Sequence, residues 1–248
     1  MQPVMIVTGG GQGIGAACAR LGAARGYAVA ISFRSARAYA EAVVAEITRA
    51  GGRGFAMQAD AADEAATERF FAAVDRQLGP VTALVNNAGI TGPVSKLDEL
   101  RGGMLDEVMA VNVQGCFIAL REATRRMATD RGGQGGAIVN ISSRASEIGG
   151  AGEWVHYAAS KGAVDTLTIG ASRELAPRGI RVNAVNPGLI DTEIHARAGM
   201  PDRVERFRPA IPMGRAGTAE EVAKVVLWLL SDEASYVTGA LVPVGGGR

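Results

Sequence analysis

Residues Val4–Ala17 read VMIVTGGGQGIGAA: an apolar run, a glycine-rich turn and the start of an alanine-rich segment with helical periodicity. Val4–Thr8 has the composition of a buried strand, and the glycines open the following helix. Gly9, Gly13 and Gly15 allow a tight turn and let a diphosphate approach the amino end of that helix. The Gly-Lys-Ser/Thr of a Walker phosphate loop is missing. The stretch predicts a strand–turn–helix unit that binds a dinucleotide, although its Gly-x-x-x-Gly-x-Gly spacing is not the usual one.

The same strand-then-helix order repeats along the chain. The strand candidates are Val4–Thr8, Tyr27–Phe33, Gly54–Asp60, Val81–Gly89, Gly136–Ser143, Gly179–Gly188 and Gly239–Gly247. They are almost continuously apolar and alternate with helical patterns, which indicates a parallel sheet covered on both faces. We therefore expect an α/β protein with a three-layer, doubly wound Rossmann fold, in which one domain (residues 1–248) holds a parallel seven-stranded sheet with helices on both faces.

The longest irregular span is Gly188–Gly217, which is too long for an idle connection. We interpret it as a substrate lid. The alternative is a surface excursion with short helices of its own. A mild excess of arginines in the span would suit an anionic substrate or an acyl-carrier partner, but a solvated lid face is the simpler explanation.

The overall composition excludes several classes of protein. The chain has 248 residues, 48% of them hydrophobic, and a formal net charge of +1, so no global field favours nucleic acid or an anionic membrane. Cys18 and Cys116 lie far apart, which indicates free thiols in a reducing compartment. No apolar run approaches the ~18 residues of a membrane helix. His156 and His195 lack metal-ligand spacing. We expect a cytoplasmic protein with no metal, nucleic-acid or membrane partner.

The choice of dinucleotide depends on the end of the second predicted strand. An acidic residue about 20 positions after the glycine loop normally holds the ribose of NAD. No Asp or Glu occurs before Glu41, whereas Arg34 and Ser35 end the strand region. An arginine here favours the 2′-phosphate of NADP over NAD. The alternative is that Arg34 is a solvated loop cation.

Tyr157 and Lys161 stand at i and i+4 of a predicted helix and share one face. An ammonium group close to the phenol is expected to lower its pKa from about 10 towards a useful acid–base range. Ser142 or Ser143 ends a predicted strand, where ligands bind in such folds. Asn112 is a polar misfit inside a helix, either bonded through a water towards Lys161 or a kinked position.

Seven motifs in a fixed order then resemble the short-chain dehydrogenase/reductase family over essentially the whole chain. They are TGGGQGIG (Thr8–Gly15), NNAG (Asn86–Gly89), the VN pair ending at Asn112, NISS (Asn140–Ser143), YAASK (Tyr157–Lys161), NPG (Asn186–Gly188) and YVTG (Tyr236–Gly239). Similarity is greatest to 3-oxoacyl-carrier-protein reductases and sugar dehydrogenases. The resemblance implies reversible hydride transfer between NADP(H) and a carbonyl or secondary-alcohol substrate. It also implies a homotetramer.

In that family a serine polarises the substrate oxygen, a tyrosine transfers the proton, a lysine binds the nicotinamide ribose and lowers the tyrosine pKa, and an asparagine supports a proton relay. These catalytic roles fall on Ser143, Tyr157, Lys161 and Asn112, with Ser143 preferred because the family uses the second serine of the pair. The residues implied to border the cofactor are Gly9, Gly11, Gln12, Gly13, Ile14, Gly15, Arg34, Ser35, Asp60, Ala61, Asn87, Ala88, Gly89, Tyr157, Lys161, Pro187, Gly188, Ile190 and Thr192.

Three features depart from the family pattern. Gln12 replaces the usual basic residue of the loop, which leaves Arg34 as the main candidate for binding a 2′-phosphate. Gly245 replaces a usual Asp or Asn, and one extra residue separates Ser143 from Tyr157. A binding module that senses NADP without turnover is the alternative function, and the set of Asn112, Ser143, Tyr157 and Lys161 argues against it.

Overall fold

A single seven-stranded parallel sheet runs through the protein in the order β3-β2-β1-β4-β5-β6-β7. The computed structural model describes residues 2–248, apart from the side chains of His195 and Arg197. The strands are β1 (Val4–Val7), β2 (Ala28–Phe33), β3 (Gly54–Gln58), β4 (Val81–Asn86), β5 (Gly136–Ile141), β6 (Ile180–Pro187) and β7 (Leu241–Val244). β1, β2 and most of β4, β5 and β6 are buried, as expected of apolar strands covered on both faces.

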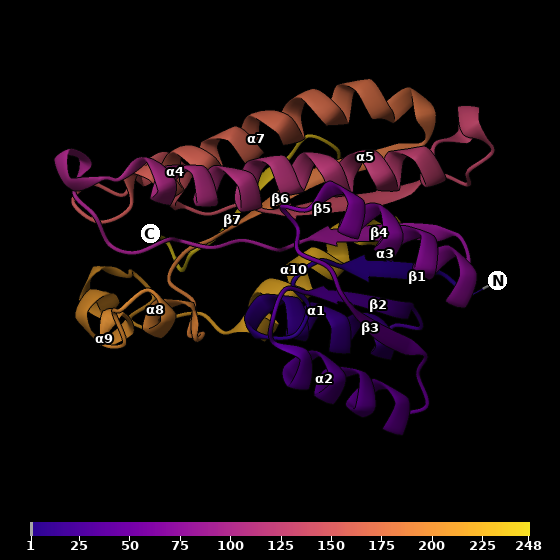
Figure 1. Cartoon of the computed structure of the whole chain (residues 1–248), viewed down its shortest axis with the longest axis horizontal. Helices are drawn as coiled ribbons and strands as arrows, with labels where there is room; N and C mark the ends of the chain where they lie inside the picture. Colours follow the sequence, from indigo (N-terminus) through magenta and orange to yellow (C-terminus); the bar gives the residue numbers. More distant parts are fainter. Residues whose placement is uncertain (1) are drawn as a thin grey trace.

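Helices form a layer on each face of this sheet (Figure 1). They are α1 (Gly13–Ala24), α2 (Arg37–Arg49), α3 (Glu64–Gln77), α4 (Gly102–Met109), α5 (Gly115–Met127), α6 (Ala145–Ile148), α7 (Val155–Leu175), α8 (Ile194–Arg197), α9 (Arg203–Phe207) and α10 (Ala219–Leu230). One buried cluster joins α1, α2 and α10 to the sheet, and a second joins α3, α5 and α7 to the opposite face. The predicted three-layer, doubly wound fold is confirmed.

The strand order places the functional edge. β1 pairs with β2 on one side and with β4 on the other. The direction in which successive strands are added to the sheet therefore reverses between β1 and β4. In open parallel sheets, such a reversal leaves a crevice at the carboxyl ends of the strands. The loops after β1, β4, β5 and β6 all leave the sheet at this edge.

The sequence was expected to contain no apolar run long enough for a membrane helix, but the segment Gly102–Met127 meets that criterion. α4, a π-helical turn (Ala110–Gln114) and α5 follow without a break and together meet the length and composition of a span, with 44% of the most apolar window buried. The second half packs against β4 and contributes Ala119, Leu120 and Ala123 to the core cluster. A core helix passes the same test, and its apolar character is explained here by burial.

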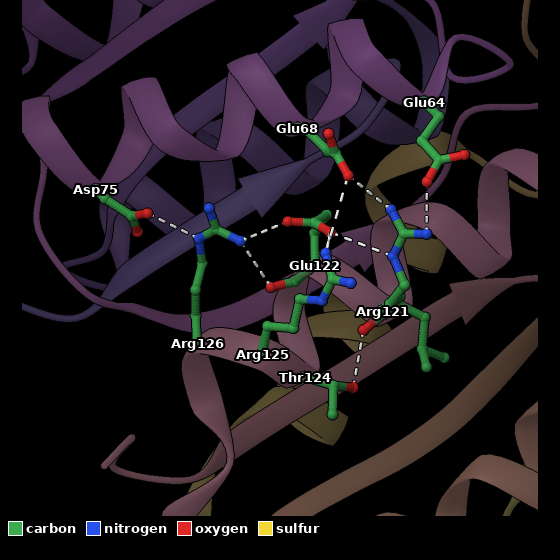
Figure 2. A network of polar contacts seen from close by, with 9 residues as sticks. Glu64, Glu68, Asp75, Arg121, Glu122, Thr124, Arg125 and Arg126 are labelled. Atoms are coloured by element: carbon green, nitrogen blue, oxygen red, sulfur yellow. Dashed lines mark hydrogen bonds and ion pairs between the residues drawn. The ribbon is translucent and has the colours of Figure 1, made fainter. Parts of the chain in front are cut away.

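A cluster of charged residues ties α5 to α3 (Figure 2). The Glu122 carboxylate is only 5% exposed and lies 2.7 Å from Arg125, 2.8 Å from Arg126 and 3.3 Å from Arg121. Arg121 also pairs with Glu64 and Glu68, and Arg126 with Asp75. Burial alone would raise the pKa of Glu122, but the hydrogen bonds and charges of these arginines hold it below its usual range.

Replacing Glu122 by Gln is expected to lower the free energy of unfolding by about 2–3 kcal/mol at neutral pH, because guanidinium groups lose a buried counter-charge. A carboxyl with a depressed native pKa contributes stability above its unfolded pKa, and that contribution is lost as the pH falls through the native value. Urea unfolding should therefore show the gap between wild type and variant closing in acid. Glu68→Gln, at an exposed carboxylate, is the control and should change stability by less than ~1 kcal/mol; an equal loss in both variants would contradict the account.

Candidate active site

A cavity of about 780 Å³ lies at the carboxyl edge of the sheet. Its walls come from the loops after β1 to β6, from the start of α7, from the 188–217 segment and from Arg248. Among the residues singled out from the sequence, those that line it are Gly9, Gly11, Gln12, Gly13, Ile14, Arg34, Ser35, Asp60, Ala61, Asn87, Ala88, Gly89, Ser143, Tyr157, Lys161, Pro187, Gly188, Ile190 and Thr192. Gly15 and Asn112 are not part of the lining.

The glycine loop is held by Asn87 and Thr8. The Asn87 amide donates to the carbonyl oxygens of Thr8 at 2.9 Å and Gly9 at 3.1 Å, while the Thr8 hydroxyl accepts from the backbone N–H groups of Asn87 and Ala88. Gly9 has φ 63° and Gly13 has φ 51°, in the left-handed region where a side chain costs energy. At Gly9, Gly11 and Gly13 the loop therefore presents bare backbone to the cavity at the amino end of α1, and Gln12 and Ile14 complete this wall.

Gly15, which was expected to border the cofactor, lies behind the cavity lining and packs closely against the loop. A Cβ built there would lie 2.5 Å from the Asn87 Nδ2 and 2.6 Å from the Gly9 carbonyl oxygen. The absence of a side chain lets α1 approach the loop closely, which is one of the reasons for a third glycine in such turns.

Arg34 reaches the cavity from the end of β2 and forms an ion pair with Glu107 of α4 at 3.2 Å. Both side chains are about half exposed, at 53% and 55%, so the pair is weak and readily exchanged. Sequence reasoning left Arg34 without a partner, because nothing in the spacing of residues 34 and 107 predicts that α4 returns to this point.

Two neighbouring serines have different roles. The Ser142 hydroxyl donates to the Lys161 carbonyl at 3.1 Å and is buried in the structure. Both serines border the cavity, and Ser143 hydrogen-bonds with Tyr157, which acts to lower the pKa of the phenol against the effect of burial. Ser143 and Tyr157 therefore form the pair that faces the cavity.

The electrostatics of Tyr157 differ from the sequence expectation. Burial raises the pKa of Tyr157, whereas the hydrogen bond with Ser143 and the charge of Arg203 lower it. The Lys161 Nζ lies 5.7 Å from the centre of the Tyr157 ring and donates to the Ile141 carbonyl at 2.8 Å. Its own pKa falls to about 8 because it is buried, with Cys116 and Asp165 acting in the opposite direction. The pKa of Tyr157 is therefore raised overall, contrary to the expected lowering, and the groups that partly offset the effect of burial are Ser143 and Arg203.

Asn112 sits in the π-helical turn and is 1% exposed. Its Oδ1 accepts from the Ile90 N–H at 2.8 Å, and its Nδ2 donates to the Ile90 carbonyl at 2.8 Å and the Ser160 hydroxyl at 2.9 Å. These direct hydrogen bonds agree with the interpretation of Asn112 as a distorted helix position. Asn112 fixes the loop after β4 directly. A Cβ on Gly89 would lie 3.2 Å from its Oδ1 and 3.3 Å from the Lys161 Nζ.

Comparison with known proteins extends this picture. Residues 9–248 match the family model described as Enoyl-(Acyl carrier protein) reductase. The chain is 51% identical, over 99% of both chains, to an uncharacterized oxidoreductase, YgfF, of Escherichia coli K12. It is 39% identical to the 3-oxoacyl-[acyl-carrier-protein] reductase FabG of Staphylococcus aureus Mu50, covering 98% of this chain and 96% of that one.

Solved structures agree. A dehydrogenase/reductase of Sinorhizobium meliloti 1021 superimposes with a TM-score of 0.91 at 39% identity, over 99% of this chain and 94% of that one. A short-chain dehydrogenase of Burkholderia cenocepacia J2315 in complex with NADP gives a TM-score of 0.90 at 35% identity, over 99% and 97%. The chain belongs to the short-chain dehydrogenase/reductase family. It is an oxidoreductase of that family.

In this short-chain dehydrogenase/reductase, the side of the cavity beyond Tyr157 is aromatic and cationic. Trp154 and Phe207 line it, and Arg203 lies between them with its guanidinium carbon 4.3 Å and 4.7 Å from the two ring centres. The guanidinium carbon of Arg248 also lies over the Phe207 ring, 5.0 Å from its centre. From the sequence, Arg203 was noted only as one of several arginines in the 188–217 segment, and Trp154, Phe207 and Arg248 were not singled out, because their convergence depends on how that segment folds.

Asp165 is a buried carboxylate one turn after Lys161, and its charge acts to raise the pKa of that lysine. The Asn186 Nδ2 donates to both of its oxygens at 3.2 Å. The spacing of four residues between Lys161 and Asp165 on one helix is the sequence signal that could have identified Asp165.

Replacing Asp165 by Asn is expected to lower the pKa of Lys161 further below about 8, since burial already lowers it and Asp165 opposes this. As the pH rises, the variant should then lose its affinity for a nicotinamide dinucleotide and its activity at a lower pH than wild type does. A titration of dinucleotide affinity against pH measures the shift, and Asp165→Glu should restore the wild-type profile. Identical profiles for wild type and Asp165→Asn would rule the coupling out.

Proposed function

We propose that the protein is an NADP(H)-dependent oxidoreductase that interconverts a carbonyl compound and a secondary alcohol, with Tyr157 as general acid and base. The observation that carries the proposal is the convergence of Ser143, Tyr157 and Lys161 on one cavity that continues past the glycine loop to Arg34. Perturbed titratable groups in a concave site are typical of catalysis.

The residues present fit a nicotinamide dinucleotide. The glycines of the loop offer bare backbone at a helix amino end for the diphosphate, and Arg34, which lines the cavity, would bind a 2′-phosphate. Asp60 and Ala61 would border the adenine. Asn87, Ala88 and Gly89 would border the ribose of the adenosine. Pro187, Gly188, Ile190 and Thr192 would lie along the nicotinamide, with Lys161 on its ribose. The nicotinamide supplies or accepts the hydride when bound.

The chain's own residues would handle the proton. Ser143 donates a hydrogen bond to the substrate oxygen and polarises the carbonyl. Tyr157 gives its phenolic proton to that oxygen as the alcohol forms and takes it back in the reverse direction. Asn112 holds the loop at Ile90 and so keeps the wall beside Lys161 in place. The 188–217 segment, as a lid, would exclude water from these steps.

The test is a substrate screen with NADPH and NADH against ketones, ketoacyl thioesters and sugars. Turnover of at least one carbonyl class that depends on the dinucleotide supports the proposal. The relatives named as 3-oxoacyl-[acyl-carrier-protein] reductases make ketoacyl thioesters the first class to try, and sugars the second. Tight NADPH binding with no turnover of any class would favour a cofactor-sensing module.

Replacing Arg34 by Ala is expected to lower the ratio of kcat/KM for NADPH over NADH by at least about tenfold, because a charge-assisted contact with the 2′-phosphate is worth about 1.5–3 kcal/mol. Glu107→Gln is the matched control, since it frees the same arginine from its ion pair and should leave the ratio equal or higher. A wild-type preference for NADH, or an unchanged ratio in Arg34→Ala, would contradict the assignment.

We further propose a homotetramer in the cytoplasm. α7 and the helix around Asn112 would form one interface, and α10 with β7 the other. Phe117 on α5 is 51% exposed and Trp228 on α10 is 37% exposed, which would be covered by such contacts. Sedimentation or light scattering measures the mass directly.

A further inference from the structure

Three arginine side chains gather around one aromatic ring in the wall of the cavity. The guanidinium carbons lie 4.7, 5.2 and 5.0 Å from the centre of the Phe207 ring for Arg203, Arg206 and Arg248, respectively. No two of these carbons can therefore be farther apart than twice 5.2 Å. All four residues line the cavity. Cations held so close to one another repel, and an anion that binds between them relieves the repulsion.

Only one of the three cations is neutralised by a side chain of the described residues. The Arg203 guanidinium lies 2.5 Å from a Glu153 carboxylate oxygen. Arg206 and Arg248 take part in none of the ion pairs that the described part of the chain forms. These two guanidinium groups therefore stand at the cavity wall with hydrogen-bond donors to offer and without a carboxylate to accept them.

Arg248 is held in place from two sides. The Arg144 Nε donates to its main-chain oxygen at 2.9 Å, and the Met213 N–H donates to the Gly246 carbonyl at 3.1 Å. The second bond ties the stretch before Arg248 to the 188–217 segment, and the same segment carries Arg206 on α9. The two arginines thus come from different parts of the chain and meet at one ring, so that their positions are set before a ligand arrives.

The contacts of the arginine cluster lead to the start of the helix that carries Tyr157. The Arg203 guanidinium carbon lies 4.3 Å from the centre of the Trp154 ring, and the Trp154 indole donates to the Gly92 carbonyl at 3.2 Å. Trp154 directly precedes α7, and Tyr157 lies in the first turn of that helix. A molecule with one end at Tyr157 would therefore pass Trp154 before its other end reaches Phe207.

We propose that Arg206 and Arg248 bind an anionic group, a carboxylate or a phosphate, at the far end of the carbonyl substrate. The inference rests on the proposed function and names the class of substrate. Trp154 and Phe207 would pack against the carbon chain between the carbonyl and the anion.

The charge of the cavity lining favours the same class of molecule. Its cationic side chains are Arg34, Arg144, Lys161, Arg203, Arg206 and Arg248, and its acidic ones are Asp60, Glu153 and Glu193. A cleft with an excess of one charge concentrates ions of the opposite charge. Arg34 is assigned to the cofactor, which leaves the cluster at Phe207 for the substrate.

The test compares the binding of two matched pairs of ketones in the presence of NADP⁺. The pairs are 4-oxopentanoate with its methyl ester, and dihydroxyacetone phosphate with dihydroxyacetone. Ligand-observed NMR titration measures each affinity, and the oxidised dinucleotide supplies no hydride, so the result does not depend on turnover. We expect the anionic member of at least one pair to bind at least about tenfold more tightly than its neutral partner. The pair that shows this preference distinguishes a carboxylate from a phosphate.

Substitutions then assign the preference to the two arginines. Arg206→Gln and Arg248→Gln should each lower the ratio of anionic to neutral affinity by at least about threefold, and the double variant should bring it close to one. Affinity for the neutral ketone and for NADP⁺ should stay unchanged, which a general disturbance of the site would not allow. Arg208→Gln is the matched control, because this arginine of the same segment is half exposed and pairs with Glu205. It should keep the wild-type ratio.

Equal affinity for both members of both pairs in the wild type would overturn the inference, as would a preference that survives in the double variant. Turnover that is confined to neutral ketones would also overturn it and would leave the proposed reaction standing. An anion preference that needs both arginines, without turnover of any carbonyl by NADPH or NADH, would support the anion site and refute the reaction alone.

Discussion

The Tyr157→Phe variant is expected to lose about 10³-fold or more of its kcat for carbonyl reduction while NADPH affinity stays within about threefold of wild type. Phenylalanine keeps the ring in the wall of the cavity and the packing of α7, but it has no proton to give to the substrate oxygen. Ser143 loses its phenolic partner and can polarise the carbonyl only by its own hydrogen bond. Stopped-flow or steady-state reduction rates, with fluorescence titration of NADPH, separate the chemical step from binding.

Tyr236→Phe is the matched control because the Tyr236 side chain is fully exposed, and it should leave the rate unchanged. A Tyr157→Phe variant with more than about a tenth of wild-type activity would show that another group moves the proton, such as a water held by Ser143. A parallel loss of NADPH affinity would instead point to a disturbed site, and the Tyr157 role would then need a different test.

The sequence allowed the sheet and its edge to be predicted because each buried strand is apolar over its length and each is followed by a helical pattern. The same alternation places the glycine loop and Ser143 at carboxyl ends of strands, which meet at one edge whatever the details of packing, and it places Tyr157 on a helix that follows β5. Local rules therefore suffice for residues whose position is fixed by their own strand or helix.

Interactions between distant segments were not predictable in the same way. The partner of Arg34 is Glu107, and Lys161 turns to the Ile141 carbonyl, because helix packing decides which groups come within hydrogen-bond reach. Asn112 was recognised as a misfit, but the π-helical turn that satisfies it through Ile90 needs an extra residue per turn that polarity patterns do not reveal.

The substrate side shows this limit most clearly. The 188–217 segment was recognised by its length, yet the placement of Arg203 between Trp154 and Phe207 depends on a fold that has no periodic signal. The residues proposed to face the cofactor are largely backbone or glycine and follow from local geometry, whereas those of the proposed substrate side are side chains brought together by the 188–217 segment. Substrate choice is consequently the part of the function with the weakest sequence signal.

Gly15→Ala is expected to weaken NADPH binding by at least about tenfold, which corresponds to about 1.4 kcal/mol, and to destabilise the fold by about 1–3 kcal/mol. The added Cβ would lie 2.5 Å from the Asn87 amide nitrogen and 2.6 Å from the Gly9 carbonyl, so α1 and the loop must separate. Asn87 cannot yield cheaply, because the same amide donates to Thr8 and Gly9 and holds the loop against β1. Urea unfolding and NADPH titration measure the two effects.

Gly170→Ala provides the matched control for this substitution. Gly170 lies inside α7 with open space around the position of a Cβ, so alanine should raise stability by about 0.5–1 kcal/mol through its helix propensity and leave NADPH affinity unchanged. If Gly15→Ala behaved like Gly170→Ala, the close approach of α1 to the loop would be irrelevant to binding. The glycines of Val4–Ala17 would then act only through backbone freedom at Gly9 and Gly13, and crowding at Gly15 would have no part in shaping the diphosphate site.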